Sequence, residues 1–297
     1  DGQIILWNFR NREVIRVFSE RHKGPVKNLC INDSNQQIVS SDNLEIYVWN
    51  MINGKKINTH RRRLRSRIGS TENMLVNTQK YIVISPDCGK ALFVLKKELI
   101  IRDINTGKTI VKIKLKDNEE LSVFDFSPNS NLLAFAYGKL KLNPTTFVAG
   151  VKILNLKTKK IIRNLTEDGG DGSKIKDLLF INSGKELLTY RAGYGYSYWS
   201  LRKGKLIKKY DIKASTTSPR VQKGSMKLLD TNDQIYHSTL KGLVFRSLEN
   251  PNKGLDLINT QWALATKPVF SYEGQLSILK VKNGVIFNGF RQYAKTT

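Results

Sequence analysis

Short alternations of apolar and polar residues recur along the whole chain and are interrupted by tight polar turns. An alternation with a period of two is typical of a half-buried β-strand. Turns rich in Asn, Asp and Gly between two such runs are typical of hairpins. The chain is therefore expected to be antiparallel β-structure with almost no helix. The copies of this pattern cover residues 4–18, 44–57, 99–113, 151–162, 196–210 and 243–257.

The copies recur at intervals of roughly 40–50 residues, which is the range of propeller repeats. Units of about 40–45 residues with four short strands each would fill the 297 residues seven times. The sequence thus predicts one domain over residues 1–297, an all-β, seven-bladed β-propeller with four-stranded antiparallel blades. The copies are anchored on Trp7, Trp49, Arg102, Leu154, Trp199 and Arg246.

The first residues resemble the third strand of a repeat rather than its beginning. Asp1 precedes Trp7 by the same interval that separates Asn43 from Trp49 in the next copy. No initiator Met is present, and we expect the first two strands of this blade to be missing. The chain is therefore expected to be a fragment of a longer protein. Upstream sequence would supply the missing strands, or the strand–turn–strand segment 275–290 would close the ring.

One copy is similar to a complete repeat of the WD40 family, on segments 22–26, 38–43 and 47–50. That family has a Gly-His near the start of each repeat, an Asp before the third strand and a closing Trp-Asp. Here Arg21 replaces the Gly, Asn43 stands in the position of the Asp with Asp42 beside it, and Asn50 replaces the closing Asp. The resemblance implies a propeller that serves as a binding platform.

The resemblance also implies a structural hydrogen-bonded relay through His22, Ser40, Asp42 or Asn43, and Trp49. A Ser, a His and an Asp in one repeat invite a second interpretation, a catalytic triad. A nucleophile elbow would require a Gly-flanked Ser on a sharp turn between a strand and a helix. The sequence has no such element, so the relay is the favoured interpretation and no enzymatic activity is expected.

Composition narrows the class of protein further. Hydrophobic residues make up 40% of the chain, enough for a continuous core. No apolar run is long enough for a membrane span, and no secretory signal pattern is found. Cys30 and Cys88 are the only cysteines, and both lie in strand-like or turn segments, so a disulfide framework is not implied. We therefore expect a reducing intracellular setting, cytoplasmic or nuclear, with no metal, no cofactor and no membrane contact.

Charge is the unusual quantity, because 50 Lys and Arg oppose 25 Asp and Glu for a net charge of +25. Such an excess attracts polyanions and acidic protein surfaces. Many lysines, however, fall on the last strand of a repeat, as Lys112, Lys114 and Lys116 do on one face. Lysines on an edge strand also guard against edge-to-edge aggregation. Both explanations stay open at this point.

The longest connections are expected on one face of the propeller, where scaffolds carry variable binding loops. They span residues 60–71, 138–150, 166–174, 191–196 and 215–225. The first holds five guanidinium groups suited to phosphate or carboxylate, although a solvated basic loop or a nuclear-import signal is an alternative. The fourth could form an aromatic and cationic contact surface, or it could pack in the core. The candidate partner-binding residues are Arg61, Arg62, Arg63, Arg65, Arg67, Arg191, Tyr194 and Tyr196.

These features predict a non-enzymatic scaffold that binds an acidic or phosphorylated protein partner through its loops. The rival hypothesis is an RNA- or ribonucleoprotein-binding propeller, for which affinity should fall steeply with salt. A third hypothesis is an accessory propeller of a larger multidomain enzyme.

Overall fold

The structure is a computed structural model, and it divides the chain into two compact units. Unit 1 comprises residues 1–117 with the turns 128–131 and 156–159, and unit 2 comprises the rest. The residues described are 2–8, 11–61, 82–95, 98–116, 119–142, 145–167, 174–191, 194–210, 226–228, 234–238, 242–247, 249, 256–258, 269–270, 276–281 and 284–289.

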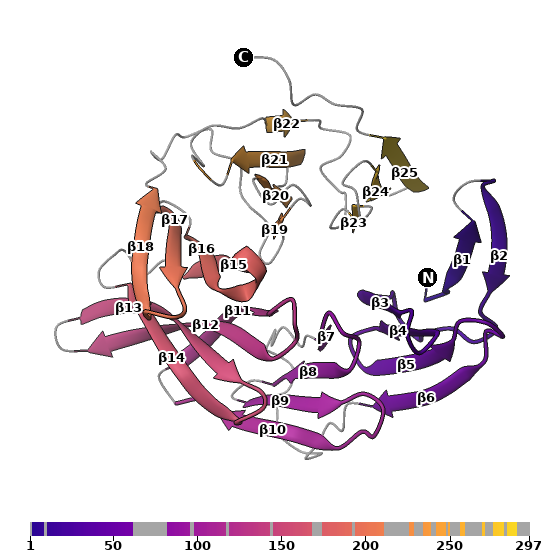
Figure 1. Cartoon of the computed structure of the whole chain (residues 1–297), viewed down its shortest axis with the longest axis horizontal. Coiled ribbons are helices and arrows are strands. Elements are labelled where there is room, and N and C mark those ends of the chain that lie inside the picture. The colour runs from indigo at the N-terminus through magenta and orange to yellow at the C-terminus, as the bar shows by residue number, and fades with distance from the viewer. Residues whose placement is uncertain are drawn as a thin grey trace, which may run out of the picture. The chain divides into compact units, whose positions relative to one another are not determined.

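Every sheet in the described part of the chain is antiparallel, as the alternation predicts (Figure 1). Unit 1 contains one two-stranded hairpin and two four-stranded sheets, each a meander in chain order. Its strands are β1 (Ile5–Asn8) and β2 (Glu13–Val17), then β3 (Asn28–Asn32), β4 (Gln37–Ser41), β5 (Glu45–Asn50) and β6 (Lys56–Arg61), then β7 (Ile82–Ile84), β8 (Lys90–Val94), β9 (Glu98–Asp103) and β10 (Thr109–Lys114).

Unit 2 contains three four-stranded sheets and one three-stranded sheet. The 3-10 turn η2 (Asn182–Gly184) is the one helical element among the described residues. The strands are β11 (Glu119–Phe126), β12 (Leu132–Leu142), β13 (Thr145–Asn155) and β14 (Lys160–Glu167); β15 (Ile175–Ile181), β16 (Glu186–Arg191), β17 (Gly195–Ser200) and β18 (Lys205–Tyr210); β19 (Lys227–Leu228), β20 (Gln234–Ser238), β21 (Gly242–Ser247) and β22 (Asp256–Ile258); and β23 (Val269–Phe270), β24 (Leu276–Val281) and β25 (Gly284–Gly289).

Neighbouring sheets within a unit pack face to face, with their first strands in contact. In unit 1, β3 contacts β7, and in unit 2, β15 contacts both β11 and β19. Trp199 on β17 belongs to the core shared with the β11–β14 sheet, whereas Tyr198 beside it belongs to the core shared with Met226 and Ile235. Because successive side chains of a strand point to opposite faces, each inner sheet buries both of its faces. The fourth strand remains as the outer edge.

One turn is used repeatedly between the third and fourth strands. Its first residue carries a side-chain oxygen that accepts a backbone N–H further along the turn; Asn50 Oδ1, for example, accepts from Ile52 and Asn53 at 2.9 Å. Near its end lies a residue with a positive φ, which glycine adopts without steric cost. The turns start at Asn50, Asp103 and Ser200 and carry Gly54 (φ 72°), Gly107 (φ 69°) and Gly204 (φ 64°).

A cation or imidazole from the preceding sheet packs beneath each of these glycines. The best-defined case is Arg163 on β14, whose Nε donates to Leu201 O and whose Nη2 donates to Arg202 O, both at 2.9 Å. A Cβ on Gly204 would lie 3.0 Å from Arg163 Cδ. The close approach therefore requires glycine for its missing side chain as well as for its backbone conformation.

The same contact recurs in unit 1, where it joins consecutive sheets. His60 Nε2 on β6 contacts the carbonyl oxygen of Ile104, and its ring lies 3.1 Å from a Cβ built on Gly107. Arg16 on β2 lies in the equivalent position under Gly54. We call these three contacts the glycine-turn clasps. They fix the outer strand of one sheet to the last turn of the next.

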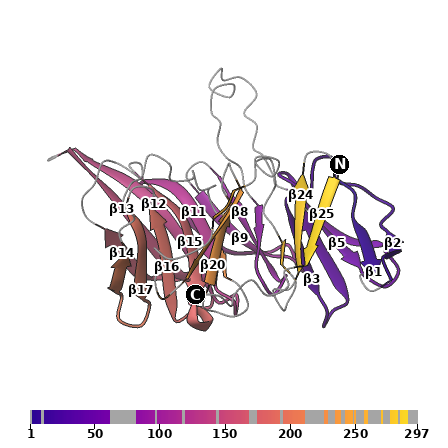
Figure 2. The same cartoon turned by 90° about the horizontal axis from the view of Figure 1, so that it is seen from above.

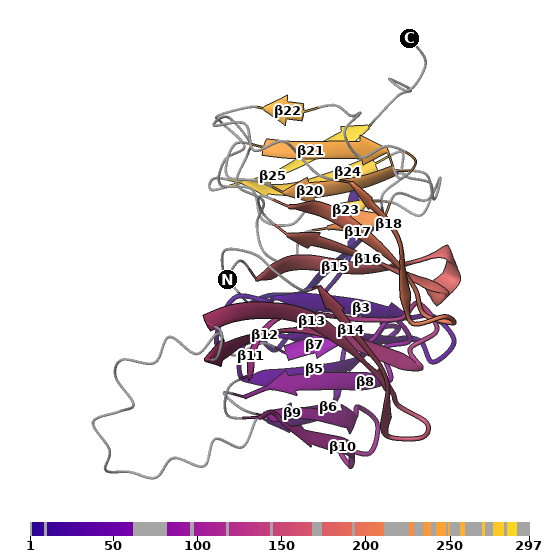
Figure 3. The same ribbon diagram turned by 90° about the vertical axis from the view of Figure 1, so that its left-hand side faces the viewer.

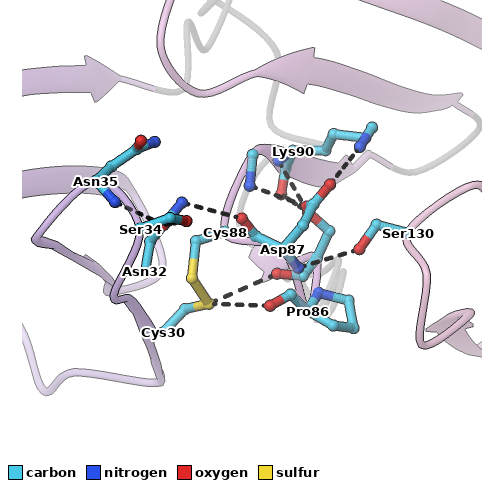
Figure 4. The surroundings of a disulfide bond; sticks show 11 residues. Cys30, Asn32, Ser34, Asn35, Pro86, Asp87, Cys88, Lys90 and Ser130 are labelled. Carbon is cyan, nitrogen blue, oxygen red and sulfur yellow. Dashed lines mark hydrogen bonds and ion pairs between the residues drawn. A yellow bond between two sulfur atoms is a disulfide. The ribbon is translucent and has the colours of Figure 1, made fainter.

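A disulfide also joins two sheets of unit 1, between Cys30 on β3 and Cys88 in the β7–β8 turn (Figure 4). Beside it, Asn32 Nδ2 donates to Asp87 O at 3.4 Å, and Asp87 N donates to Ser130 Oγ at 3.0 Å. The sequence did not imply this bond. Disulfides persist in oxidising surroundings, so this pair no longer supports the expected reducing setting.

Residues 138–142 and 145–150 are strand rather than the expected loop. β12 and β13 pair without interruption from Leu132 with Asn155 to Leu142 with Thr145. Their hairpin is longer than the neighbouring β15, β16 and β17 (Figure 2). The physical reason is that Lys139 and Lys141 alternate with Leu140 and Leu142, the period that extends a strand.

Replacing Gly204 with alanine should destabilise the fold by about 1–2 kcal/mol, because a Cβ at positive φ is strained and would also press on Arg163. Chemical denaturation of Gly204→Ala should show this as a lower midpoint. Gly24→Ala is the control, since that glycine has no positive φ and its Cβ would meet nothing closer than 4.0 Å. Equal stability of the two variants would contradict the clasp.

Removing the disulfide should cost about 4 kcal/mol, because it closes a loop across 58 residues and limits the unfolded chain. The double variant Cys30→Ser/Cys88→Ser should unfold at a lower denaturant concentration than the parent protein. Dithiothreitol should lower the midpoint of the parent to that of the variant and leave the variant unchanged. A parent whose midpoint is insensitive to reductant would show that the bond does not form.

Candidate functional site

The side chains of the expected relay lie in contact inside the β3–β6 sheet. Trp49 Nε1 donates to Ser40 Oγ at 2.8 Å, and Ser40 Oγ lies 2.7 Å from His22 Nε2. His22 Nδ1 faces Asp42 Oδ2 at 3.4 Å. Asp42 Oδ1 in turn accepts the backbone N–H of Glu45 at 2.7 Å.

The hydrogen-bond donors and acceptors of the relay fit one arrangement of protons. Ser40 accepts from the indole and donates its own proton to His22 Nε2, so the imidazole carries its proton on Nδ1, towards Asp42. Burial lowers the pKa of His22 below the ordinary 6.5, although the nearby Asp42 acts in the opposite direction. The imidazole is therefore neutral at pH 7.

The order Ser–His–Asp is that of a catalytic triad, but its surroundings differ from those of a nucleophile. Ser40 and Trp49 are both fully buried (0% exposed). The hydroxyl of Ser40 already accepts a hydrogen bond from the indole N–H of Trp49. A substrate carbonyl has no route to Ser40 Oγ in this arrangement. The relay instead has a structural role: its hydrogen bonds connect strands β4 and β5 to the segment that precedes β3.

The relay continues outward to the first of the predicted arginines. The ring of Tyr47 stacks on His22 at 4.1 Å between centroids, and its hydroxyl donates to Glu45 at 2.6 Å. Burial, followed by this hydrogen bond, raises the pKa of Tyr47 to about 12, so the hydroxyl remains a donor at neutral pH. Glu45 also pairs with Arg61 Nε at 2.7 Å.

A second sheet keeps the indole–hydroxyl part of this arrangement. In the β15–β18 sheet, Trp199 Nε1 donates to Thr189 Oγ1 at 3.0 Å. Thr189 and Ser40 hold the same place in the second strands of their sheets, and Trp199 and Trp49 the same place in the third strands. Sequence reasoning missed Thr189, although a hydroxyl one strand before a Trp was a usable signal.

Unit 1 has a basic hollow of about 580 Å³ between β6 and the β9–β10 hairpin, lined by Tyr47, Lys56, Thr59, His60, Arg61, Arg102 and Gly107. We call it the unit 1 hollow. Its cations have partners close by: Lys56 pairs with Glu20, and Arg61 pairs with Glu45. Arg102 lies over the ring of Phe93 at 5.1 Å. Carboxylates therefore offset much of the positive charge here.

Unit 2 has a second hollow, of about 480 Å³, between β14 and β18. The guanidinium of Arg191 lies 4.4 Å and the ammonium of Lys209 lies 5.7 Å from the ring centroid of Tyr194. Three cations and no carboxylate are found among its lining residues. We call it the unit 2 hollow; it is lined by Asn164, Leu165, Thr166, Arg191, Tyr194, Trp199, Gly204, Lys205, Leu206 and Lys209.

The unit 2 hollow brings together two of the predicted partner-binding residues and leaves out the third. Arg191 ends β16 and Tyr194 lies in the following turn, so both line it. Tyr196 is 2% exposed and packs against Tyr190 in the core, and we therefore exclude it from the contact surface. Arg191 is itself 3% exposed, so it contributes to the lining from a buried position. Lys205 and Lys209 were missed, because on an edge strand they resemble aggregation-guarding lysines.

The arginine segment is represented in the structure by its first member. Arg61 is the last residue of β6, and its side chain is 70% exposed. The remaining four, Arg62, Arg63, Arg65 and Arg67, lie outside the described residues. Asp42 of the relay is described, with the contacts given above.

Two other kinds of feature are absent from the described ranges. No group of three or more His, Cys, Asp or Glu side chains there is placed to hold a metal ion. In the same part of the chain, no helix has the length and apolar character needed to cross a membrane.

Comparison with known proteins identifies the fold but no family. No protein-family model matches the sequence. No curated protein matches it either. Among 1170 solved chains with a similar fold is Kuenenia stuttgartiensis hydrazine synthase, with a TM-score of 0.65 over 97% of this chain and 90% of that chain. At 10% sequence identity, this similarity concerns the fold alone.

The buried imidazole should make stability depend on pH. Because the pKa of His22 is lower in the folded protein, the unfolded chain binds the proton more readily. The stabilisation is thus complete above the unfolded pKa of about 6.5 and is lost as pH falls through the folded pKa. Thermal unfolding between pH 7.5 and pH 5 should show a falling melting temperature, and His22→Gln should reduce that dependence. An unchanged slope in His22→Gln would show that other groups account for it.

Proposed function

We propose that the chain is a non-enzymatic scaffold, a seven-bladed WD40-like β-propeller that binds an acidic surface on a protein partner. The repeated sheet architecture supports this proposal. Three of the four-stranded meanders share the glycine turn and its clasp, and two of them share the indole–hydroxyl contact. Such repetition is typical of repeat folds, in which each unit buries its faces against its neighbours.

The observation that carries the binding proposal is the composition of the unit 2 hollow. Arg191 and Lys209 both approach the face of Tyr194, while Lys205 lies further along β18. Arginine and tyrosine are enriched at the energetic centres of protein interfaces. Arg191 is 3% exposed, so the cations that this surface presents to a partner are the exposed Lys205 and Lys209. A concave surface that joins exposed cations to an aromatic ring favours an anionic segment of a protein.

A scaffold function also accords with the role of the buried polar groups. The buried polar side chains contact one another and are shielded from solvent, as in His22, Ser40 and Asp42. The exposed charged side chains are instead mostly lysine and arginine. The net charge of +25 supplies a long-range field that would speed encounter with an acidic partner.

The proposal is tested by the binding of fluorescent poly-glutamate and of single-stranded RNA of similar length to the full chain. We expect saturable binding of poly-glutamate at about 0.15 M salt, with a smaller loss of affinity on added salt than RNA shows. Binding of RNA alone would favour the ribonucleoprotein hypothesis. Binding of neither polymer would contradict the proposed function.

The arginine segment should contribute to this binding. Replacing Arg61, Arg62, Arg63, Arg65 and Arg67 with Gln should weaken poly-glutamate binding by about tenfold or more, because several cation contacts are lost together. The melting temperature should change little, since exposed substitutions usually change stability by about 0.5 kcal/mol or less.

The matched control removes the same charge from exposed lysines elsewhere in the chain. Equal weakening in both variants would indicate that net charge, rather than this segment, governs binding. The control replaces Lys27, Lys108, Lys114, Lys160 and Lys185 with Gln.

A further inference from the structure

We infer that the unit 1 hollow binds a single compact oxyanion, a carboxylate or a phosphate group, through the guanidinium of Arg102. The hollow lies within unit 1, between β6 and the β9–β10 hairpin (Figure 3). It is separate from the unit 2 hollow, so the site is independent of the proposed function. Three observations support it: the place of Arg102 in the repeat, the hydrogen-bond donors of its guanidinium, and the ion pairs around it.

Arg102 occupies the position that tryptophan holds in two other sheets. It directly precedes the first residue of the glycine turn, as Trp49 and Trp199 do in their own sheets. Each of the three lies opposite the second residue of the preceding strand. The β7–β10 sheet therefore carries a cation where the β3–β6 and β15–β18 sheets carry an indole.

The hydrogen-bond acceptor that belongs to this position is also replaced. Ser40 and Thr189, the fourth residues of β4 and β16, accept the indole N–H in their sheets. The fourth residue of β8 is Phe93, whose ring centroid lies 5.1 Å from the guanidinium of Arg102. Within the described part of the chain, Arg102 Nε is buried and has no hydrogen-bond partner. A buried donor without an acceptor is unfavourable, and a bound oxyanion would supply one.

The guanidinium keeps most of its donors for a ligand. An arginine has five N–H groups. One of them is used among the described residues, where Nη1 donates to Arg61 O at the long distance of 3.5 Å. The side chain of Arg102 is half-buried and lines the hollow, so a ligand there can reach it. Its planar fork matches two oxygens of a carboxylate or a phosphate group.

The strand register places the Arg61–Glu45 ion pair on the other face of β6. Arg61 lies opposite Glu45 on β5, whereas His60 lies opposite Ile46. Ile46 packs in the core shared with the β7–β10 sheet. Because directly opposite residues share a face and successive residues alternate, His60 is directed towards that sheet and Arg61 away from it. Glu45 therefore does not neutralise Arg102.

The other carboxylates near the hollow pair with lysines. Glu20 pairs with Lys56, and Glu98 pairs with Lys112 at 2.9 Å. Glu98 shares a face of β9 with Arg102, because the two are four residues apart on one strand. Within the described ranges, Arg102 itself forms no ion pair. It is thus the cation of the hollow whose charge is left for a ligand.

The test titrates inorganic phosphate, and separately acetate, into the full chain with isotopically labelled arginine nitrogens, at a constant ionic strength of about 0.15 M in chloride. The Nε–H resonance of Arg102, identified by its loss in Arg102→Lys, should shift saturably. That of Arg163 should not, since Arg163 Nε already donates to Leu201 O. Tighter binding of phosphate than of acetate would identify phosphate as the preferred oxyanion, and equal or weaker binding would identify carboxylate. No saturable shift with either anion would overturn the site.

A matched pair of arginine variants separates the site from net charge. Arg102→Gln should weaken phosphate binding, measured by calorimetry, by about tenfold or more, because a charge-assisted bidentate contact is lost. Arg21→Gln removes an exposed arginine that lines neither hollow, and it should leave the affinity within about twofold of the parent. Equal weakening by both variants would overturn the site. Melting curves check the fold, and the Arg102 resonance of the parent decides the outcome if Arg102→Gln does not fold.

Discussion

Burial of both faces of each inner sheet is the constraint on which the rest of the structure depends. The alternating side chains of β17 show it directly, since Trp199 enters one core and Tyr198 the other. Removing either neighbouring sheet would expose a complete apolar face, and a solvated sheet of this composition would not be stable alone. The glycine-turn clasps and the disulfide connect the same neighbouring sheets. They connect neighbouring sheets through contacts other than apolar packing.

The position of the outer strands at the edges of the sheets also explains why cations gather there. An outer strand has one paired edge and one free edge, and charged side chains are the usual protection for a free edge. In unit 1, Glu20 and Glu45 accompany the cations of the hollow, which makes that site largely self-neutralising. The lining of the unit 2 hollow likewise combines cations with an aromatic ring. Cations of the outer strands therefore line both hollows.

Much of the local structure could be predicted from the sequence, because it depends on neighbours along the chain. Alternation located the strands, and Asn-Gly and Thr-Gly pairs located the turns around Gly54 and Gly107. The burial of Trp49 and its bonded indole followed from the same repeat. Contacts between sheets could not be predicted in this way. Cys30 and Cys88 belong to two different sheets. The position of Arg163 under Gly204 likewise depends on how two sheets pack together. The core position of Tyr196 required the register of β16 and β17.

The bond between Cys30 and Cys88 makes a covalent ring of all the residues between them. That ring includes β4, β5 and β6, with Ser40, Asp42 and Trp49 of the relay. A protease that cuts the backbone once anywhere inside it would not divide the protein. The two pieces would travel as one species in electrophoresis without reductant and separate only when a thiol is added. Backbone integrity and molecular integrity are therefore distinct properties in this part of the chain.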